Sequence, residues 1–128
     1  MHIAILAPSE RSFISHFLPD QDVNDLPIGY FGAPFIGTLI TELLNNHHQV
    51  TAITTSVAIN NDYTVKKFTA DNFSWIVVPQ RPRSLRMNGK KRGYILDFFS
   101  DEQKLMVDCI RDVSPDFVHA HWSYDFRI

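Results

Sequence analysis

Four short apolar runs limit what this chain can fold into. They span residues 2–7, 50–55, 73–78 and 116–121, and each is followed by polar or turn-forming residues. Continuous apolar runs of this length are typical of strands in a parallel sheet, because such a sheet is covered on both faces. Parallel neighbours must be joined by a crossover, which is usually a helix. The sequence therefore predicts an α/β protein.

Two helical patterns supply the crossovers. The first covers residues 35–44, and its apolar positions are Phe35, Ile36, Leu39, Ile40, Leu43 and Leu44. The second starts at Ser100, and its apolar stripe is Leu105, Met106, Cys109, Ile110 and Val113. Right-handed crossovers then favour a Rossmann-like, three-layer parallel sheet with the four runs in the order 3-2-1-4. A further strand segment, residues 64–69, precedes the third run across a turn at 70–72.

Length and composition narrow the class. A chain of 128 residues predicts a single domain, and a formal net charge of -2 argues against a nucleic-acid binder. The one cysteine, Cys109, excludes an internal disulfide and a thiolate metal site, so a reducing compartment such as the cytoplasm is expected. The first residues lack a basic stretch followed by a long apolar core, so the sequence predicts neither a signal peptide nor a membrane span.

Two imidazoles lie at the carboxyl end of the last run. His119 and His121 are two residues apart, so in a strand they project from the same face. Ligands of open α/β sheets bind outside the carboxyl ends of the strands, which makes this pair a candidate for contact with a sugar or a phosphate. The alternative is a structural pair that is hydrogen-bonded to the backbone. A metal site would need a third ligand, and no companion motif is present, so no metal is expected.

The basic side chains are concentrated in one segment. Residues 81–92 hold half of the lysines and arginines, including Arg83, Arg86 and Lys90. Such a segment is either a solvated loop or a surface for phosphate groups and anionic lipid. A dinucleotide site is not indicated, because Gly29, Gly32 and Gly37 do not form the G-x-G-x-x-G pattern.

Two stretches resemble the N-terminal, acceptor-side domain of the retaining GT-B glycosyltransferases, the family 4-like relatives of glycosyl transferase group 1. The first is Pro-Asp-Phe-Val-His-Ala-His-Trp at residues 115–122. The second is the leucine-bearing helix pattern followed by His-His-Gln-Val-Thr at 47–51, where the family typically has Gly-His-Glu-Val-Thr. The family's glycine pair falls on Tyr30 and Phe31 here, between Gly29 and Gly32, so we expect this loop-to-helix turn to be built differently.

This resemblance implies a function and a partner domain. Residues 1–128 would be a single, truncated N-terminal domain, the acceptor-side portion of an enzyme that transfers a sugar from a nucleotide-sugar donor. A C-terminal GT-B domain would bind the donor, no other cofactor would be needed, and this portion alone would be inactive. The acceptor would be a sugar or a lipid-linked sugar, with residues 81–92 in contact with the inner face of the membrane. The alternative is a non-enzymatic flavodoxin-like or regulatory binding module.

The resemblance also implies which residues meet the substrate. The acceptor would lie against Gly29, Gly32, His119, His121 and Trp122. His121 is the candidate catalytic residue, and Trp122 offers a flat apolar face for a sugar ring. The basic side chains Arg83, Arg86 and Lys90 would attract the charged part of the acceptor.

Overall fold

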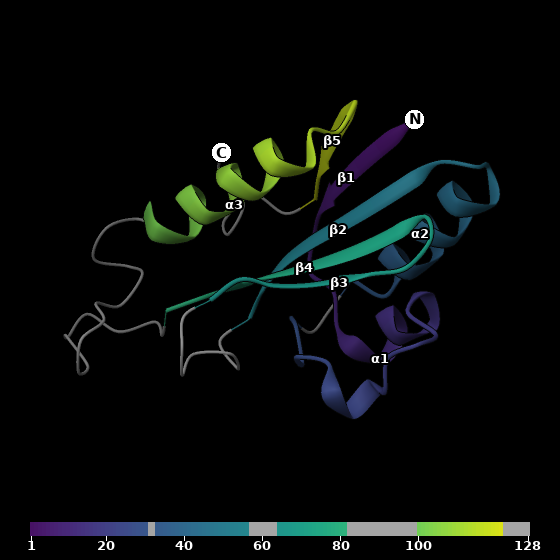
Figure 1. The fold of residues 1–128 in the computed structure, drawn as a ribbon, viewed down its shortest axis with the longest axis horizontal. Helices are drawn as coiled ribbons and strands as arrows, with labels where there is room; N and C mark the ends of the chain where they lie inside the picture. The colour runs from purple at the N-terminus through teal and green to yellow at the C-terminus, as the bar shows by residue number, and fades with distance from the viewer. Residues whose placement is uncertain (31–32, 57–63, 82–99, 122–128) are drawn as a thin grey trace.

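A computed structural model describes residues 1–30, 33–56, 64–81 and 100–121. Its strands are β1 (His2–Leu6), β2 (Gln49–Ser56), β3 (Lys66–Thr69), β4 (Phe73–Pro79) and β5 (Phe117–Ala120). Its α-helices are α1 (Arg11–Ile14), α2 (Phe35–Asn45) and α3 (Ser100–Val113), and its 3-10 helices are η1 (Ser15–Phe17) and η2 (Val23–Asp25). Figure 1 shows how these elements surround one sheet.

The sheet has the order β3-β4-β2-β1-β5. Strands β4, β2, β1 and β5 run parallel, so the predicted order of the four apolar runs and the α/β, Rossmann-like class are confirmed. Strand β3 pairs antiparallel with β4 through the turn at 70–72, which adds an edge strand to the parallel ones. The local hairpin therefore extends the sheet without disturbing the crossovers.

Helices cover both faces of the sheet, as the two helical patterns predict (Figure 1). On one face, Ile36 and Ile40 of α2 pack with Ile5 of β1 in one buried cluster. On the other face, Met106 of α3 packs with Leu6 in a second cluster. Successive strand residues point to opposite faces, which is why neighbours in β1 belong to different clusters. Each fully buried aliphatic side chain contributes about 1.5–3 kcal/mol to folding.

Strand β5 corrects one expectation. The last apolar run was expected to be a buried strand, but all four residues of β5 are exposed, with Phe117 at 57% and Val118 at 41%. Among the described residues β5 pairs with β1 alone, so it forms an edge of the sheet. An apolar run shows that a strand tolerates burial, but it does not show whether another element covers it.

The end of α2 leads to the first testable prediction. His47 has a φ of 64°, and its N–H donates to the Leu44 carbonyl while the His48 N–H donates to the Leu43 carbonyl. This is a Schellman motif with a histidine at the left-handed position that usually holds glycine. His47→Gly should therefore raise the free energy of unfolding by about 0.5–1 kcal/mol, since glycine carries no Cβ penalty there.

The urea unfolding midpoint measures this change. Asn46→Gly is the matched control, because Asn46 is also exposed but has a φ of -90° and so gains nothing from glycine. If His47→Gly is no more stable than Asn46→Gly, the left-handed strain at position 47 is not what limits this turn.

Candidate ligand site at the carboxyl edge of the sheet

The two histidines lie where the strand order reverses. From β1 the chain crosses to β2 on one side, whereas β5 pairs with β1 on the other side. In this pairing His119 is opposite Ile5, and the His121 N–H donates to the Leu6 carbonyl at 2.8 Å. The ladder thus fixes both histidines at the carboxyl edge of the sheet, which is where open α/β sheets bind ligands.

The rings of these histidines are in contact with each other. The ring centroids of His119 and His121 are 4.0 Å apart and the planes are tilted by 38°, so the predicted projection from one face is confirmed. Phe35, the first residue of α2, meets the His121 ring edge-on at a centroid distance of 5.7 Å. The start of α2 and the end of β5 therefore converge.

His121 carries an unused polar atom at this point. Its Nε2 is buried and has no hydrogen-bond partner among the described residues. Burial lowers the pKa of His121 below its ordinary value, and the neighbouring His119 lowers this pKa further. The ring is therefore neutral at pH 7, and a neutral imidazole can both donate and accept a hydrogen bond. A ligand hydroxyl at Nε2 would remove the cost of about 1–3 kcal/mol that an unpaired buried polar group carries.

The protonation of His121 gives the second prediction. Its imidazole Hε1 signal should titrate below 6.5 in an NMR pH series. Phe35→Ala and His119→Ala should each raise this pKa, because the first exposes the ring and the second removes a like charge. Val118→Ala, on the opposite face of β5, is the control and should leave it unchanged.

The lowered pKa of His121 also makes the free energy of unfolding depend on pH. The unfolded chain binds the proton more readily than the folded one, so the stabilisation is present above about pH 6.5 and is lost as the pH falls through the lower folded pKa. A His121 titration at or above 6.5 would contradict the proposed burial of its ring.

Gly29 has a packing role near this edge. Its φ is 82°, and a Cβ added there would lie 2.2 Å from the Ser9 carbonyl oxygen. The Tyr30 N–H donates to the same oxygen, and the buried Trp75 Nε1 donates to Ser9 Oγ at 3.0 Å. Glycine is thus required to hold the loop that follows β1 against the sheet. A contact between Gly29 and an acceptor stays a prediction.

The basic segment needs a correction at its first residue. Arg81 was grouped with the solvent-facing side chains of 81–92, but it is only 2% exposed and pairs with Glu102 of α3. Its Nε donates to Glu102 Oε1 at 2.8 Å and its Nη2 to Oε2 at 2.9 Å. Arg81 therefore joins the end of β4 to the first turn of α3 and is not part of a binding surface.

Glu102 was missed by sequence reasoning. An acidic residue in the first turn of a helix is usually explained by the helix dipole, so position alone does not reveal a buried ion pair. The other predicted contacts lie outside the described residues: Gly32, Arg83, Arg86, Lys90 and Trp122.

Known proteins add nothing to this geometry. No protein-family model, curated protein or solved structure matches the chain. Within the described ranges, no group of three or more His, Cys, Asp or Glu side chains is arranged to hold a metal ion. No helix in those ranges is long and apolar enough to cross a bilayer. The site is therefore interpreted from its own residues.

Proposed function

We propose that this chain is the acceptor-side domain of a retaining glycosyltransferase that takes a sugar from a nucleotide-sugar. The observation that supports it most is the contact between His119 and His121 at the point where the strand order reverses, because His121 Nε2 has no hydrogen-bond partner in the described part of the chain. The start of α2 lies beside this pair, and the positive end of its helix dipole favours a hydroxyl-rich or anionic ligand.

In this proposal His121 positions the acceptor. Its neutral ring holds an acceptor hydroxyl by a hydrogen bond to Nε2, and the contacts with His119 and Phe35 fix the ring. Transfer also requires the donor to be held close to that hydroxyl, and a second domain supplies the donor site. The 128-residue chain alone should therefore bind an acceptor without turning it over.

The test is the substitution His121→Ala in a protein that joins this domain to its donor domain. Release of the nucleotide from a panel of nucleotide-sugars, in the presence of sugar acceptors, should fall about tenfold or more. The free energy of unfolding should change little, because the His121 side chain is only partly buried. His47→Gly, at the opposite end of α2, is the control and should retain activity.

Two results would count against this proposal. If His121→Ala unfolds the protein but the folded fraction is fully active, the histidines are structural. If the joined protein uses no nucleotide-sugar and a different cofactor co-purifies with it, a flavodoxin-like or regulatory binding module is the better description. Whether the coding sequence continues past Ile128 into a second α/β domain is the cheapest discriminating observation.

A further inference from the structure

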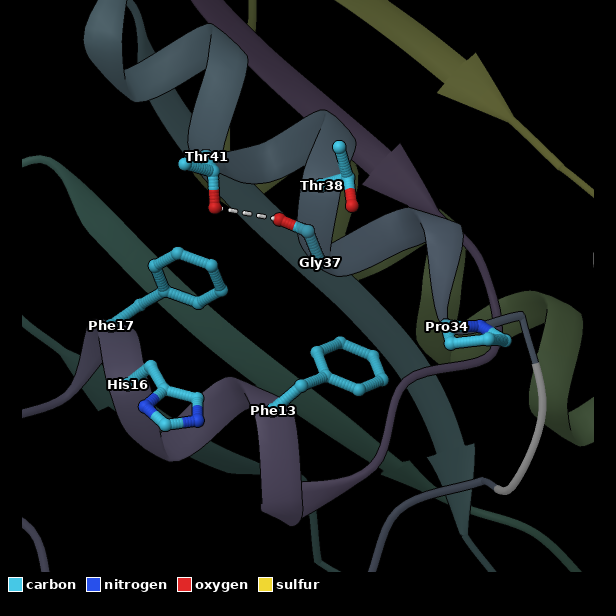
Figure 2. Close-up of a pocket in the computed structure, with 7 residues that line it drawn as sticks. All are labelled: Phe13, His16, Phe17, Pro34, Gly37, Thr38 and Thr41. Atoms are coloured by element: carbon cyan, nitrogen blue, oxygen red, sulfur yellow. Dashed lines mark hydrogen bonds between the residues drawn. The ribbon is translucent and has the colours of Figure 1, made fainter.

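A pocket of about 360 Å³ lies beside α2, and neither His119 nor His121 is among its described lining residues. Its walls include Phe13, His16 and Phe17 from the α1–η1 segment and Gly37, Thr38 and Thr41 from α2. Figure 2 shows both phenyl rings turned toward α2, with the threonines on the facing helix. The volume falls within the range of about 300–1,000 Å³ that small-molecule sites occupy.

Packing against neighbouring elements keeps the aromatic wall in place. The Phe17 ring contacts the ring of Phe73, the first residue of β4, at a centroid distance of 5.2 Å. A Cβ at Gly37 would lie 3.3 Å from the Phe13 ring, so the missing side chain lets that ring rest against the helix. The pocket is therefore formed before any ligand arrives, which reduces the entropy cost of binding.

The polar side chains of the pocket are two threonine hydroxyls and the His16 imidazole. Thr41 Oγ1 donates to the Gly37 carbonyl at 2.9 Å, so this oxygen keeps its lone pairs for a second partner (Figure 2). The Thr38 side chain is exposed, as is that of His16. No Asp, Glu, Lys or Arg is among the described residues that line the pocket.

We propose that this pocket binds a neutral saccharide unit. A pyranose ring has an apolar C–H face that can lie on a phenyl ring, and hydroxyls at its rim that can reach Thr38, Thr41 and His16. An alkyl chain would use only the phenyl rings of this wall, and an ionic ligand would find no Asp, Glu, Lys or Arg side chain among the described lining residues. This proposal names a ligand class for a second place on the domain and does not depend on sugar transfer at His121.

The test uses the 128-residue chain and saturation-transfer NMR with the methyl glycosides of glucose, galactose and mannose. Cyclohexanol and inorganic phosphate serve as comparison ligands. At least one glycoside should bind and shift the backbone amides of residues 37–41. Thr38→Val should lower the affinity for this glycoside about three- to tenfold, which is the usual effect of losing one hydrogen bond. Thr69→Val, an exposed threonine of β3, is the matched control and should not change it.

Each other outcome overturns the inference. Cyclohexanol binding as tightly as the glycosides would indicate an apolar-ligand pocket, and preferential phosphate binding would indicate an anion site. Failure of all three glycosides to bind, or binding that Thr38→Val and Phe17→Leu leave unchanged, would exclude the site. This test measures binding at α2, whereas the transferase test measures nucleotide release. Either the pocket proposal or the transferase proposal can therefore fail without the other.

Discussion

Glu102→Gln is expected to lower the free energy of unfolding by about 3–5 kcal/mol, the range found when one partner of a buried ion pair is removed. Arg81 and Glu102 are 2% and 1% exposed, and two short hydrogen bonds join their side chains. The amide keeps the shape of the carboxylate but removes its charge, so the buried Arg81 guanidinium loses its buried counter-charge and keeps the exposed Asp101. A loss of this size is a large part of the 5–15 kcal/mol that holds a typical domain folded.

Two further variants test the cause of this loss. The double replacement Arg81→Met with Glu102→Leu should destabilise less than Glu102→Gln, because no charge remains to be buried. Asp101→Asn should change stability by no more than about 1 kcal/mol, since Asp101 is 60% exposed and lies 3.4 Å from Arg81 Nη1. Urea unfolding measures all three. Equal losses from Glu102→Gln and Asp101→Asn would show that burial of this pair is not decisive.

Gly29→Ala is expected to cost about 2–4 kcal/mol, from a positive φ and from overpacking together. The added methyl group would meet the Ser9 carbonyl oxygen at 2.2 Å and the Trp75 ring at 3.0 Å, and the oxygen is backbone that cannot rotate away. We expect the loop to move and the Trp75 indole to lose its hydrogen bond to Ser9 Oγ. The urea midpoint and the NMR signal of the indole N–H report these two effects separately.

Gly37→Ala is the natural comparison for this variant. Its added methyl would meet a phenyl side chain at 3.3 Å rather than a backbone atom, and alanine favours the helix by about 1 kcal/mol. The cost of the close contact and the gain in helix propensity nearly cancel, so the free energy of unfolding should change little. If both glycine variants are equally stable, the strained loop conformation at Gly29 is not a requirement of the fold.

The elements that the sequence predicts correctly are those whose pattern is local. Strands β1, β2 and β4 and helices α2 and α3 bury their apolar residues in regular periods, so sequence alone places them. Their order in the sheet then follows from the handedness of crossovers, which holds for almost any sequence. The projection of His119 and His121 from the same face was predicted correctly for the same reason, because alternation along a strand is a local property.

The errors concern contacts between residues far apart in the chain. Arg81 shares a basic stretch with its sequence neighbours, but its burial depends on Glu102 in a different element. The exposure of Phe117 depends on what lies beyond β5, about which the strand's own residues carry no signal. The α2 pocket was also missed, because Phe13 and Phe17 form its wall only once their short helical segment packs against α2.

The ion pair between Arg81 and Glu102 has a consequence for how this fold can vary. It holds the end of β4 and the start of α3 together at two residues that bracket positions 82–101. The end of β4 and the start of α3 are therefore joined by a direct side-chain contact, so a change in the length of the chain between positions 82 and 99 should leave this contact and the strand order unchanged.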